Sequence, residues 1–328
     1  MKILCSIHLY PPEHNCGAEY MIHNINKYLI SKGHEVRILL WQANHYRIKN
    51  VYCYEGVDVF PPDHKIPETL FMWADIVMTH LDYTNETIQL GRMFKKPVVH
   101  LIHNYSVYEG IKHADRPQHI VYNSEAAKEI LNYDHNSIVL HPPVSWKQYD
   151  TNKNTEENEF ITLINLDGNK GGAILRKIAE RMPHKKFLGV KGSYSEPALE
   201  GQHTNQPPNV EIWDNTPFIM RAYERTRVLI MPSKFESWGR TATEAMCSGI
   251  PVICTATPGL LENCDKAGTY IERDNIEGWV KAIERLDDKK EYKKASKMAK
   301  ERSRELDPDK ELDRFNVWLK DIYESHNN

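Results

Sequence analysis

The sequence has little of what marks membrane, secreted or polycationic proteins. Its 328 residues contain no apolar run near the ~20 residues that span a bilayer, and the mean hydropathy is −0.60. The opening Met-Lys-Ile-Leu-Cys-Ser-Ile is too short for the apolar core of a signal peptide. Basic and acidic residues nearly balance, at 42 and 45, so a bulk electrostatic grip on nucleic acid is not expected. We expect a cytoplasmic protein without a transmembrane segment.

Metal and redox patterns are also missing. The six cysteines form no CxxC pair, which predicts reduced thiols that serve mostly as small core residues. Thirteen of the 16 histidines precede residue 150, yet none has HExxH spacing and no Cys/His ladder occurs. No GxGxxG follows the first strand, which argues against a Rossmann dehydrogenase. We predict no metal site and no cofactor.

Apolar strands alternate with amphipathic helices twice along the chain, which predicts an α/β fold of two doubly wound parts. The polar stretch 145–159 separates the two series and is expected to be a linker. Residues 311–323 carry apolar side chains on one helical face that should pack on something. The expected domains are 1–150, 151–305 and a terminal helix, 306–328, that crosses back to the first. Expected strands lie at 2–9, 36–41, 75–79, 97–102, 119–122, 137–140, 160–166, 186–190, 209–213, 227–231 and 251–254.

One segment, 227–254 (RVLIMPSKFESWGRTATEAMCSGIPVIC), joins a strand, a short loop, a helix and a second strand. Backbone N–H groups at a helix start favour an anion, typically a phosphate, and Gly239 there lets the backbone approach closely. Arg240 can add a guanidinium. Glu236 precedes the helix and Glu244 lies eight residues on, a rise of up to ~12 Å. The two carboxylates cannot act on one atom, but they could hold hydroxyl-bearing groups on either side of a diphosphate.

This glutamate pattern resembles the donor-site signature of the retaining glycosyltransferases of family 4. That family has the GT-B fold, in which two Rossmann-like domains face a cleft. The opening Tyr10-Pro11-Pro12…Gly17-Ala18-Glu19, followed by Lys32-Gly33-His34-Glu35-Val36, is similar to the family's opening. The resemblance covers nearly the whole chain, and the glutamate segment is its specific part. The compact size and the ESWGR form of the motif resemble phage-encoded members.

The resemblance implies roles for residues of the second part. Glu236 would contact hydroxyls of the donor sugar, and Glu244 would bind the nucleotide ribose. Lys170, in the turn LDGNKGG, would pair with the diphosphate. The family usually has an arginine five residues earlier, where this chain has Asn165, so Arg240 or Lys191 would have to supply that charge. The implied donor-binding residues are Lys170, Lys191, Ser237, Trp238, Gly239, Arg240 and Glu244.

In the first part, the resemblance places Gly17 opposite the phosphates and the acceptor. Cys16 stands where the family often has a second glycine. His103 ends a strand and looks like the family's donor-sugar histidine, so it joins Glu236 as a predicted catalytic residue. His80 ends the preceding strand and is ranked second. His8 also lies at a strand end and could face the acceptor.

The implied activity is transfer of a sugar, hexosyl or pentosyl, from a nucleotide-diphosphate sugar to an acceptor hydroxyl. The anomeric configuration would be retained by a front-face mechanism without a metal, and a UDP-sugar is the favoured donor. Lys170, Arg240 and the helix start would stabilise the leaving diphosphate. Two alternatives are a non-catalytic sugar-nucleotide binding protein and a GT-B epimerase or phosphorylase; the family-4 form of the motif speaks against the second.

The acceptor is expected to be a glycan, a lipid-linked sugar or a small-molecule hydroxyl. The alternative is a hydroxymethylated base in DNA, as in some phage enzymes. The near-neutral first part, with 14 basic and 16 acidic residues up to Asp150, argues against DNA. Residues 84–96 hold three basic side chains, a weak hint that leaves peripheral membrane contact open.

Overall fold

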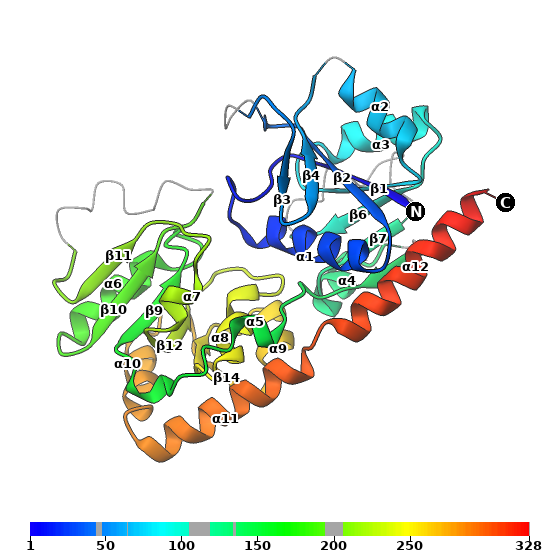
Figure 1. The fold of residues 1–328 in the computed structure, drawn as a ribbon. Helices are drawn as coiled ribbons and strands as arrows, with labels where there is room; N and C mark the ends of the chain where they lie inside the picture. The colour runs from blue at the N-terminus through cyan, green and yellow to red at the C-terminus, as the bar shows by residue number, and fades with distance from the viewer. Residues whose placement is uncertain (44–47, 64, 105–118, 134–135, 194–205, 328) are drawn as a thin grey trace. The chain divides into compact units, whose positions relative to one another are not determined.

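The computed structural model of the chain describes residues 1–43, 48–63, 65–104, 119–133, 136–193 and 206–327. The chain divides into two compact units (Figure 1). The first comprises Met1–Pro143 together with Pro308–Asn328, and the second comprises Val144–Asp307. Each unit is an α/β structure built on its own sheet. Within the described ranges, no helix is long and apolar enough to cross a membrane.

The sheet of the first unit has eight strands in the order β3-β4-β2-β1-β5-β6-β7-β8. Its pairings are parallel except for the antiparallel pair β3–β4. Both faces are covered by helices, which is why the inner strands are apolar throughout rather than alternating. The strands are β1 (Lys2–Ile7), β2 (Glu35–Leu40), β3 (Tyr52–Tyr54), β4 (Val57–Phe60), β5 (Ile76–His80), β6 (Val98–Ile102), β7 (His119–Tyr122) and β8 (Asn136–Val139).

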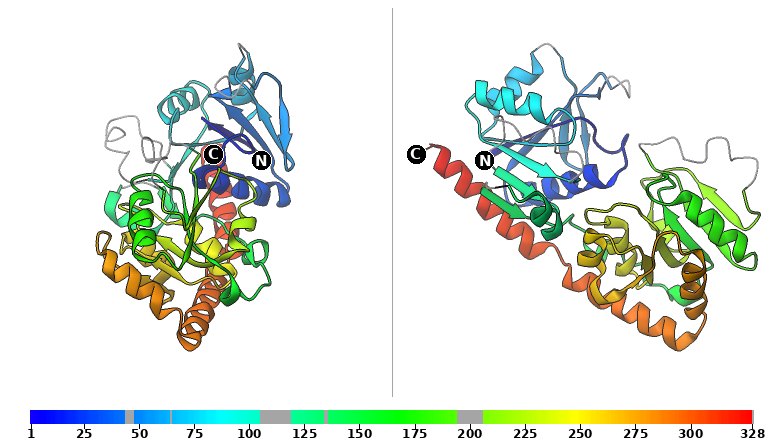
Figure 2. Two further views of the ribbon diagram at one scale, coloured as in Figure 1. Left: turned by 90° about the vertical axis from the view of Figure 1, so that its left-hand side faces the viewer. Right: turned by 180° about the vertical axis from the view of Figure 1, so that it is seen from behind.

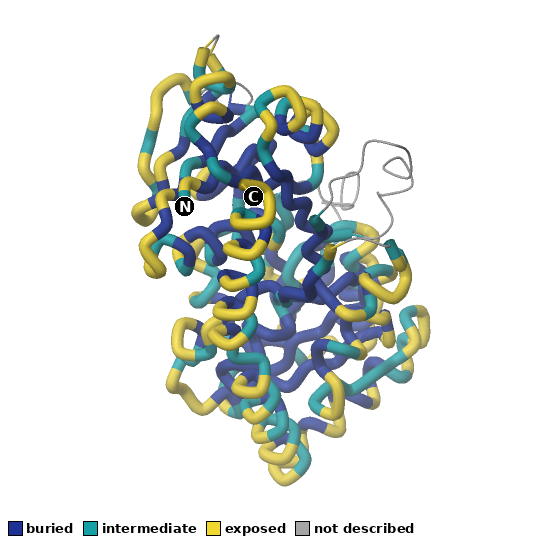
Figure 3. Tube along the Cα trace, turned by 90° about the vertical axis from the view of Figure 1, so that its right-hand side faces the viewer, coloured by how far each residue is buried: buried dark blue, intermediate teal, exposed yellow. Residues whose placement is uncertain are grey.

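Alternate residues of β1 enter two different cores. Ile3 packs with residues of α1 (Gly17–Ser31), whereas Leu4 packs with residues of α2 (Ile66–Trp73) and α3 (Thr84–Met93). The period of two along a strand sends neighbours to opposite faces, so the two cores lie on either side of the sheet. A fourth helix, α4 (Glu125–Leu131), is capped by the hydroxyl of Ser124. Figure 3 shows the strands as a buried interior and the outer helix faces as exposed.

The terminal helix α12 (Asp309–Asn327) belongs to the first unit although it follows the second in the chain. Its apolar face joins the core that α1 helps to form. Polar contacts fix the helix as well: His34 Nε2 lies 2.7 Å from Asn316 Oδ1, and His141 Nδ1 lies 2.8 Å from Glu311 Oε1. The buried residues of that face are Leu312, Phe315, Asn316, Leu319 and Ile322.

The second unit has a six-stranded parallel sheet in the order β11-β10-β9-β12-β13-β14. Figure 2 shows its helices from two further sides. The strands are β9 (Phe160–Ile164), β10 (Lys186–Val190), β11 (Val210–Trp213), β12 (Thr226–Met231), β13 (Val252–Cys254) and β14 (Gly268–Tyr270). The helices are α5 (Trp146–Tyr149), η3 (Thr155–Glu157), α6 (Gly172–Arg181), α7 (Met220–Tyr223), α8 (Arg240–Cys247), α9 (Pro258–Cys264), η5 (Asp265–Ala267), α10 (Ile276–Arg285) and α11 (Lys289–Glu305).

The predicted linker at 145–159 is wrong as a description of this stretch. It contains α5 and η3, and it packs on the second unit. The backbone oxygen of Tyr149 accepts a hydrogen bond of 2.6 Å from Ser248 Oγ, and Thr155 Oγ1 donates to the backbone oxygen of Gly249. The rings of Tyr149 and Trp146 and several polar contacts, among them Thr151 with Ser248, hold this stretch, and its apolar residues are too few to show a periodicity.

Each sheet contains one point where the strand order reverses. In the first unit the chain goes from β1 to β2 on one side, while β5 and the strands after it lie on the other. In the second unit β9 is followed by β10 on one side, and β12 lies on the other. Open α/β sheets bind ligands beyond the carboxyl ends of the strands at such points. The sites below are therefore sought there.

Candidate functional site

The turn after β9 holds Lys170 at the reversal point of the second sheet. Backbone N–H groups of Lys170 and Gly171 both donate to the carbonyl oxygen of Asp167, each at 2.9 Å. Gly171 has a φ of +100°, and a Cβ there would lie 2.5 Å from Pro232 Cγ. Only glycine fits this close, left-handed position. The turn therefore packs against the loop that follows β12. That loop carries Glu236.

Asn165, which stands in place of the family's arginine, shapes the same turn. Its φ is +72°, a conformation that asparagine tolerates better than most residues. The side-chain oxygen accepts a hydrogen bond of 3.0 Å from the Asp167 N–H. A Cβ on Gly192 would lie 2.5 Å from that same oxygen, so the amide is packed against the loop after β10. The short amide is thus a structural part of the turn.

Lys170 and Glu236 meet across the reversal point. Lys170 Nζ lies 2.7 Å from Glu236 Oε1, and Ser233 Oγ donates to the same oxygen at 3.0 Å. The carboxylate side chain is 10% exposed and the lysine side chain 31% exposed. The ammonium group can therefore be reached from solvent, while the carboxylate is held in place by two donors.

The start of α8 lies close by in the same loop. Gly239 precedes the helix with a φ of +86°, and a Cβ there would lie 2.6 Å from Leu260 Cδ2. Asn263 Nδ2 donates to the backbone oxygens of Trp238 and Gly239, each at 3.1 Å. No side chain of the described residues caps the helix. Its first backbone N–H groups suit an anion.

Glu244 is buried in the middle of α8, and each of its carboxylate oxygens has a partner. Its Oε1 forms an ion pair of 2.9 Å with Arg240 Nε, and its Oε2 accepts a hydrogen bond of 2.7 Å from the hydroxyl of Tyr223. Arg240 Nη2 also donates to the hydroxyl of Tyr149 at 3.0 Å. Burial, and then the charge of Glu244, raise the pKa of Tyr223 well above its usual value, so this hydroxyl stays a donor.

This network decides what Arg240 does in the described structure. Its guanidinium is directed to Glu244 and Tyr149, and only 9% of the residue is exposed. The sequence predicts Arg240 as a phosphate ligand; in the structure its guanidinium lies against the buried carboxylate and orients it. Each oxygen of Glu244 keeps a second lone-pair position, so the carboxylate can still accept a bond from a ligand hydroxyl.

Lys191, the other candidate replacement cation, lies at the end of β10. Its Nζ forms an ion pair of 2.6 Å with Asp214 Oδ1, and its backbone N–H donates to Trp213 at 2.9 Å. The side chain is about one-third exposed. Lys170 and Lys191 thus both lie at the carboxyl edge of this sheet. Lys170 is paired with Glu236 and Lys191 with Asp214.

Two residues that hold the site together were missed by sequence reasoning. Arg273 Nε donates to the backbone oxygen of Pro232 at 3.0 Å, and its Nη2 donates to that of Gly168 at 2.7 Å. It therefore ties the lysine turn to the glutamate loop. Asn263 fixes the start of α8 in the same way. Neither residue lies in a motif, so no signal in the sequence could have marked them.

The predicted residues of the first unit gather at its own reversal point. His80 Nδ1 lies 2.8 Å from His103 Nε2, and His8 Nε2 lies 3.5 Å from Glu19 Oε1. Cys16 precedes α1 as its N-cap, and its backbone oxygen accepts a hydrogen bond of 3.0 Å from the Tyr20 N–H. Burial lowers the pKa of His8, and lowers that of His80 well below its usual value, so both rings are neutral at pH 7.

Gly17 is the first residue of α1 and is exposed. A Cβ added to it would meet nothing within 4 Å. Sterically, any small residue would fit this position. Glycine is therefore not required here by the chain itself, in contrast to Gly171 and Gly239.

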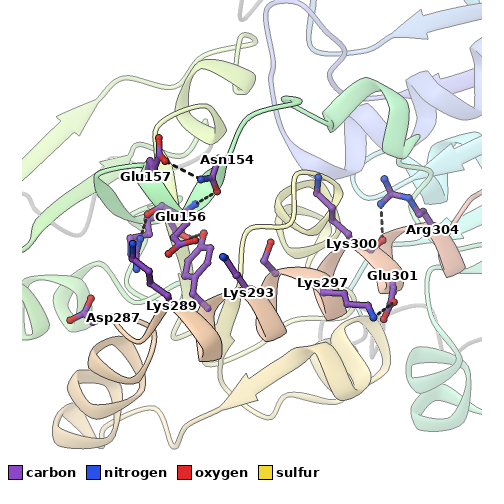
Figure 4. Close-up of a pocket in the computed structure, with 13 residues that line it drawn as sticks. Asn154, Glu156, Glu157, Asp287, Lys289, Lys293, Lys297, Lys300, Glu301 and Arg304 are labelled. Atoms are coloured by element: carbon purple, nitrogen blue, oxygen red, sulfur yellow. Dashed lines mark hydrogen bonds and ion pairs between the residues drawn. The ribbon is translucent and has the colours of Figure 1, made fainter.

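A cavity of about 730 Å³ lies elsewhere in the second unit, along α11 (Figure 4). Lysines from successive turns of that helix line it together with acidic side chains, and none of the predicted donor residues does. Lys297 is paired with Glu301 at 3.7 Å. The cavity is lined by both basic and acidic side chains, some of which are paired, so its charge does not favour one class of ligand. These lysines are Lys289, Lys293, Lys297 and Lys300.

A family model matches most of the second unit. Residues 145–304 match the family model of the glycosyl transferases group 1. The match covers the second unit nearly from end to end, including the lysine turn, the glutamate loop and α8. No curated protein sequence matches the chain.

Solved structures resemble the whole chain at low sequence identity. Sucrose-phosphate synthase from Thermosynechococcus elongatus is 16% identical, with 99% of each chain covered and a TM-score of 0.76. HepE from Anabaena, solved with UDP-glucose, is 14% identical over 99% of this chain and 100% of that one, with a TM-score of 0.74. An alpha-glucosyltransferase solved with UDP and a 13-mer DNA containing an HMU base is 15% identical over 97% and 99%, with a TM-score of 0.69.

These likenesses confirm the predicted fold, an α/β GT-B structure of two Rossmann-like units. The family match adds the enzyme class to the fold. The chain is a glycosyltransferase, and its residues 145–304 match the group 1 model.

Proposed function

We propose that this enzyme is a retaining, family-4-type transferase that moves a sugar from a nucleotide-diphosphate sugar to an acceptor hydroxyl without a metal ion. The observation that carries the proposal is the meeting of Lys170 and Glu236 at the reversal point of the second sheet, beside the start of α8. A cation, helix N–H groups and a carboxylate are thus presented along one edge. Diphosphate and sugar hydroxyls are the groups that such an edge suits.

The diphosphate would sit between Lys170 and the backbone of Ser237, Trp238 and Gly239. Lys170 would leave Glu236 and pair with the phosphate oxygens, a move that its partial exposure allows. The helix start would supply hydrogen bonds and the positive end of its dipole. These groups place positive charge where the leaving diphosphate gains negative charge, which is the part that a metal ion would otherwise play.

The two glutamates would hold the two ends of the donor. Glu236, freed from Lys170 but still bonded to Ser233, would accept hydrogen bonds from the sugar hydroxyls. Glu244 would accept from the ribose with its remaining lone pairs, while Arg240 and Tyr223 hold the carboxylate in place. His103 of the first unit stays a predicted contact of the donor sugar.

The transfer would proceed by front-face displacement. The bond between the anomeric carbon and the diphosphate oxygen breaks, and the acceptor oxygen bonds to the same face of the carbon. The acceptor's proton passes to the leaving phosphate oxygen. The products are the glycosylated acceptor and a nucleoside diphosphate. The enzyme's part is to position the groups and to stabilise the leaving charge.

A UDP-sugar is the favoured donor. HepE, which shares the fold over nearly the whole chain, was solved with UDP-glucose. For the acceptor we propose a hydroxyl of a glycan, a lipid-linked sugar or a small molecule. Hydroxymethylated bases in DNA are the second candidate, because one structural neighbour was solved with DNA that contains an HMU base.

A donor screen tests the proposal. The protein is mixed with UDP-, GDP-, ADP- and CMP-sugars in the presence of EDTA, and thermal shift and sugar-nucleotide hydrolysis are measured. Parallel arms contain an oligosaccharide mixture or hydroxymethylated DNA. A ligand that binds only the folded state raises the melting temperature, so the true donor is expected to stand out.

The arms separate the competing functions. Turnover with oligosaccharides supports the first acceptor class, and turnover only with DNA supports the second. A thermal shift without hydrolysis or transfer in any arm favours a non-catalytic sugar-nucleotide binding protein. Absence of a shift with every donor contradicts the proposed donor site.

A further inference from the structure

Three buried side chains from separate segments meet at the reversal point of the first sheet. His8 follows β1, His80 ends β5, and Glu19 lies in the first turn of α1. β1 and β5 are adjacent and parallel, with Ser6 opposite Thr79, so both histidines lie at the same edge. One ligand atom from each of the three lies within 4.8 Å of the others. Their residues are 2%, 0% and 0% exposed, respectively.

The spacing suits a small divalent ion. His8 Nε2 and Glu19 Oε1 are 3.5 Å apart, which is long for a hydrogen bond. Two ligands bound to Zn²⁺ at 2.0–2.1 Å with a tetrahedral angle lie about 3.4 Å apart. Two imidazoles and one carboxylate form a donor set that Zn²⁺ takes in proteins. The observed distance is therefore close to that of a coordinated pair.

His80 provides an independent observation. Its Nδ1 is 2.8 Å from His103 Nε2, and its Nε2 is buried with no hydrogen-bond partner among the residues that the structure describes. A ring nitrogen buried in this way normally finds a partner. Metal-bound histidines place one nitrogen on the ion and fix the ring by a hydrogen bond from the other. His80 has that second bond already.

We propose that His8, Glu19 and His80 bind one Zn²⁺ ion in the first unit, with a fourth coordination position open to water or to a ligand oxygen. His103 orients His80 from behind. The ion would lie in the first unit, so the inference does not depend on the proposed donor site of the second. A site with three protein ligands is the type that accepts an oxygen ligand at its fourth position.

A neighbouring group offers a competing location. His14, Cys16 and Glu19 also bring ligand atoms within 4.8 Å of one another. The two groups share Glu19. An ion in the first group would be bound by His80 and not by Cys16, and an ion in the second group would be bound by Cys16 and not by His80. The first group is favoured because all three of its residues are buried, whereas Cys16 is half-buried.

Metal binding by the whole chain, without an affinity tag, tests the proposal. The protein is stripped with dipicolinate and titrated with Zn²⁺ against a chromophoric chelator, and Co²⁺ replaces Zn²⁺ for an absorption spectrum. His80→Ala is the test variant. Cys16→Ser and His14→Ala are the matched controls. Circular dichroism and thermal unfolding report whether each variant folds.

The expected result is one equivalent of Zn²⁺, unchanged in both controls. The affinity should fall by more than about 100-fold in His80→Ala, since loss of an outer-shell partner alone costs 10–100-fold. Co²⁺ should show the visible bands of a four-coordinate site and no thiolate-to-metal charge-transfer band. No stoichiometric binding by the wild type overturns the proposal, and so does a thiolate band or loss of binding in Cys16→Ser. If His80→Ala does not fold, the wild-type Co²⁺ spectrum decides between the two groups.

Discussion

Lys170 Nζ lies 2.7 Å from Glu236 Oε1, and the two side chains come from loops that follow neighbouring strands, β9 and β12. Ser233 supports the same carboxylate oxygen. The ammonium group of Lys170 and the carboxylate of Glu236 therefore neutralise each other at the carboxyl edge of the sheet. A bound diphosphate and sugar would separate them, because each would then have a better-matched partner.

Loss of the Glu236 carboxylate should abolish transfer without unfolding the protein. Glu236→Ala removes the proposed acceptor of the sugar hydroxyls, and removal of one well-placed polar group from a transfer site costs about 10²–10³ in kcat. Initial rates with the donor found in the screen, and circular dichroism, are the measurements. Full activity in this variant would contradict the assignment.

Loss of Glu244 should act on donor affinity and on stability together. Glu244→Ala is expected to raise the donor KM more than Glu236→Ala does. It also leaves Arg240 buried without its counter-ion, and breaking a buried ion pair destabilises a protein by about 3–5 kcal/mol. Urea unfolding and donor titration give the two quantities. An unchanged donor affinity would refute the ribose role.

Gly171→Ala should destabilise the second unit. The φ of +100° and the contact with Pro232 together predict a cost of about 1–3 kcal/mol. Gly17→Ala is the control, because a Cβ there meets nothing within 4 Å. The free energy of unfolding in urea is measured for both variants. Equal stabilities of the two variants would contradict the close contact of Gly171 with Pro232.

Cysteine labelling should follow burial. Burial raises the pKa of the thiols of Cys5 and Cys247 to about 12, so at pH 8 both are protonated and unreactive. Cys53 is exposed and should be labelled first by a maleimide in the native protein. Peptide mass spectrometry before and after urea checks the order. Rapid native labelling of Cys5 would be incompatible with this packing.

Most of the fold could be predicted because the inner strands are apolar and bounded by turn residues. The elements that were missed lack that pattern. β3 and β4 are three and four residues long and partly exposed, so no apolar run marks them. In 145–159 the rings of Tyr149 and Trp146 anchor a polar stretch to the second unit, and two aromatic residues carry no readable periodicity.

Only the part of the candidate site that lies within a sequence motif could be predicted. The residues of the glutamate segment are close in sequence, so their loop and helix could be foreseen. The contacts that complete the site join distant positions: Arg273 bridges two loops, and Asn263 holds the start of α8. The histidine and glutamate cluster of the first unit draws on residues 8, 19 and 80, which no spacing rule connects.

Donor binding by a lysine variant tests the central claim most directly. Calorimetric titration with the donor from the screen, in EDTA, compares the wild type with Lys170→Ala and with Lys234→Ala, whose side chain is exposed on the adjacent loop. The account predicts metal-free binding that weakens more than tenfold in Lys170→Ala and is unchanged in Lys234→Ala. Equal affinities of wild type and Lys170→Ala would contradict it.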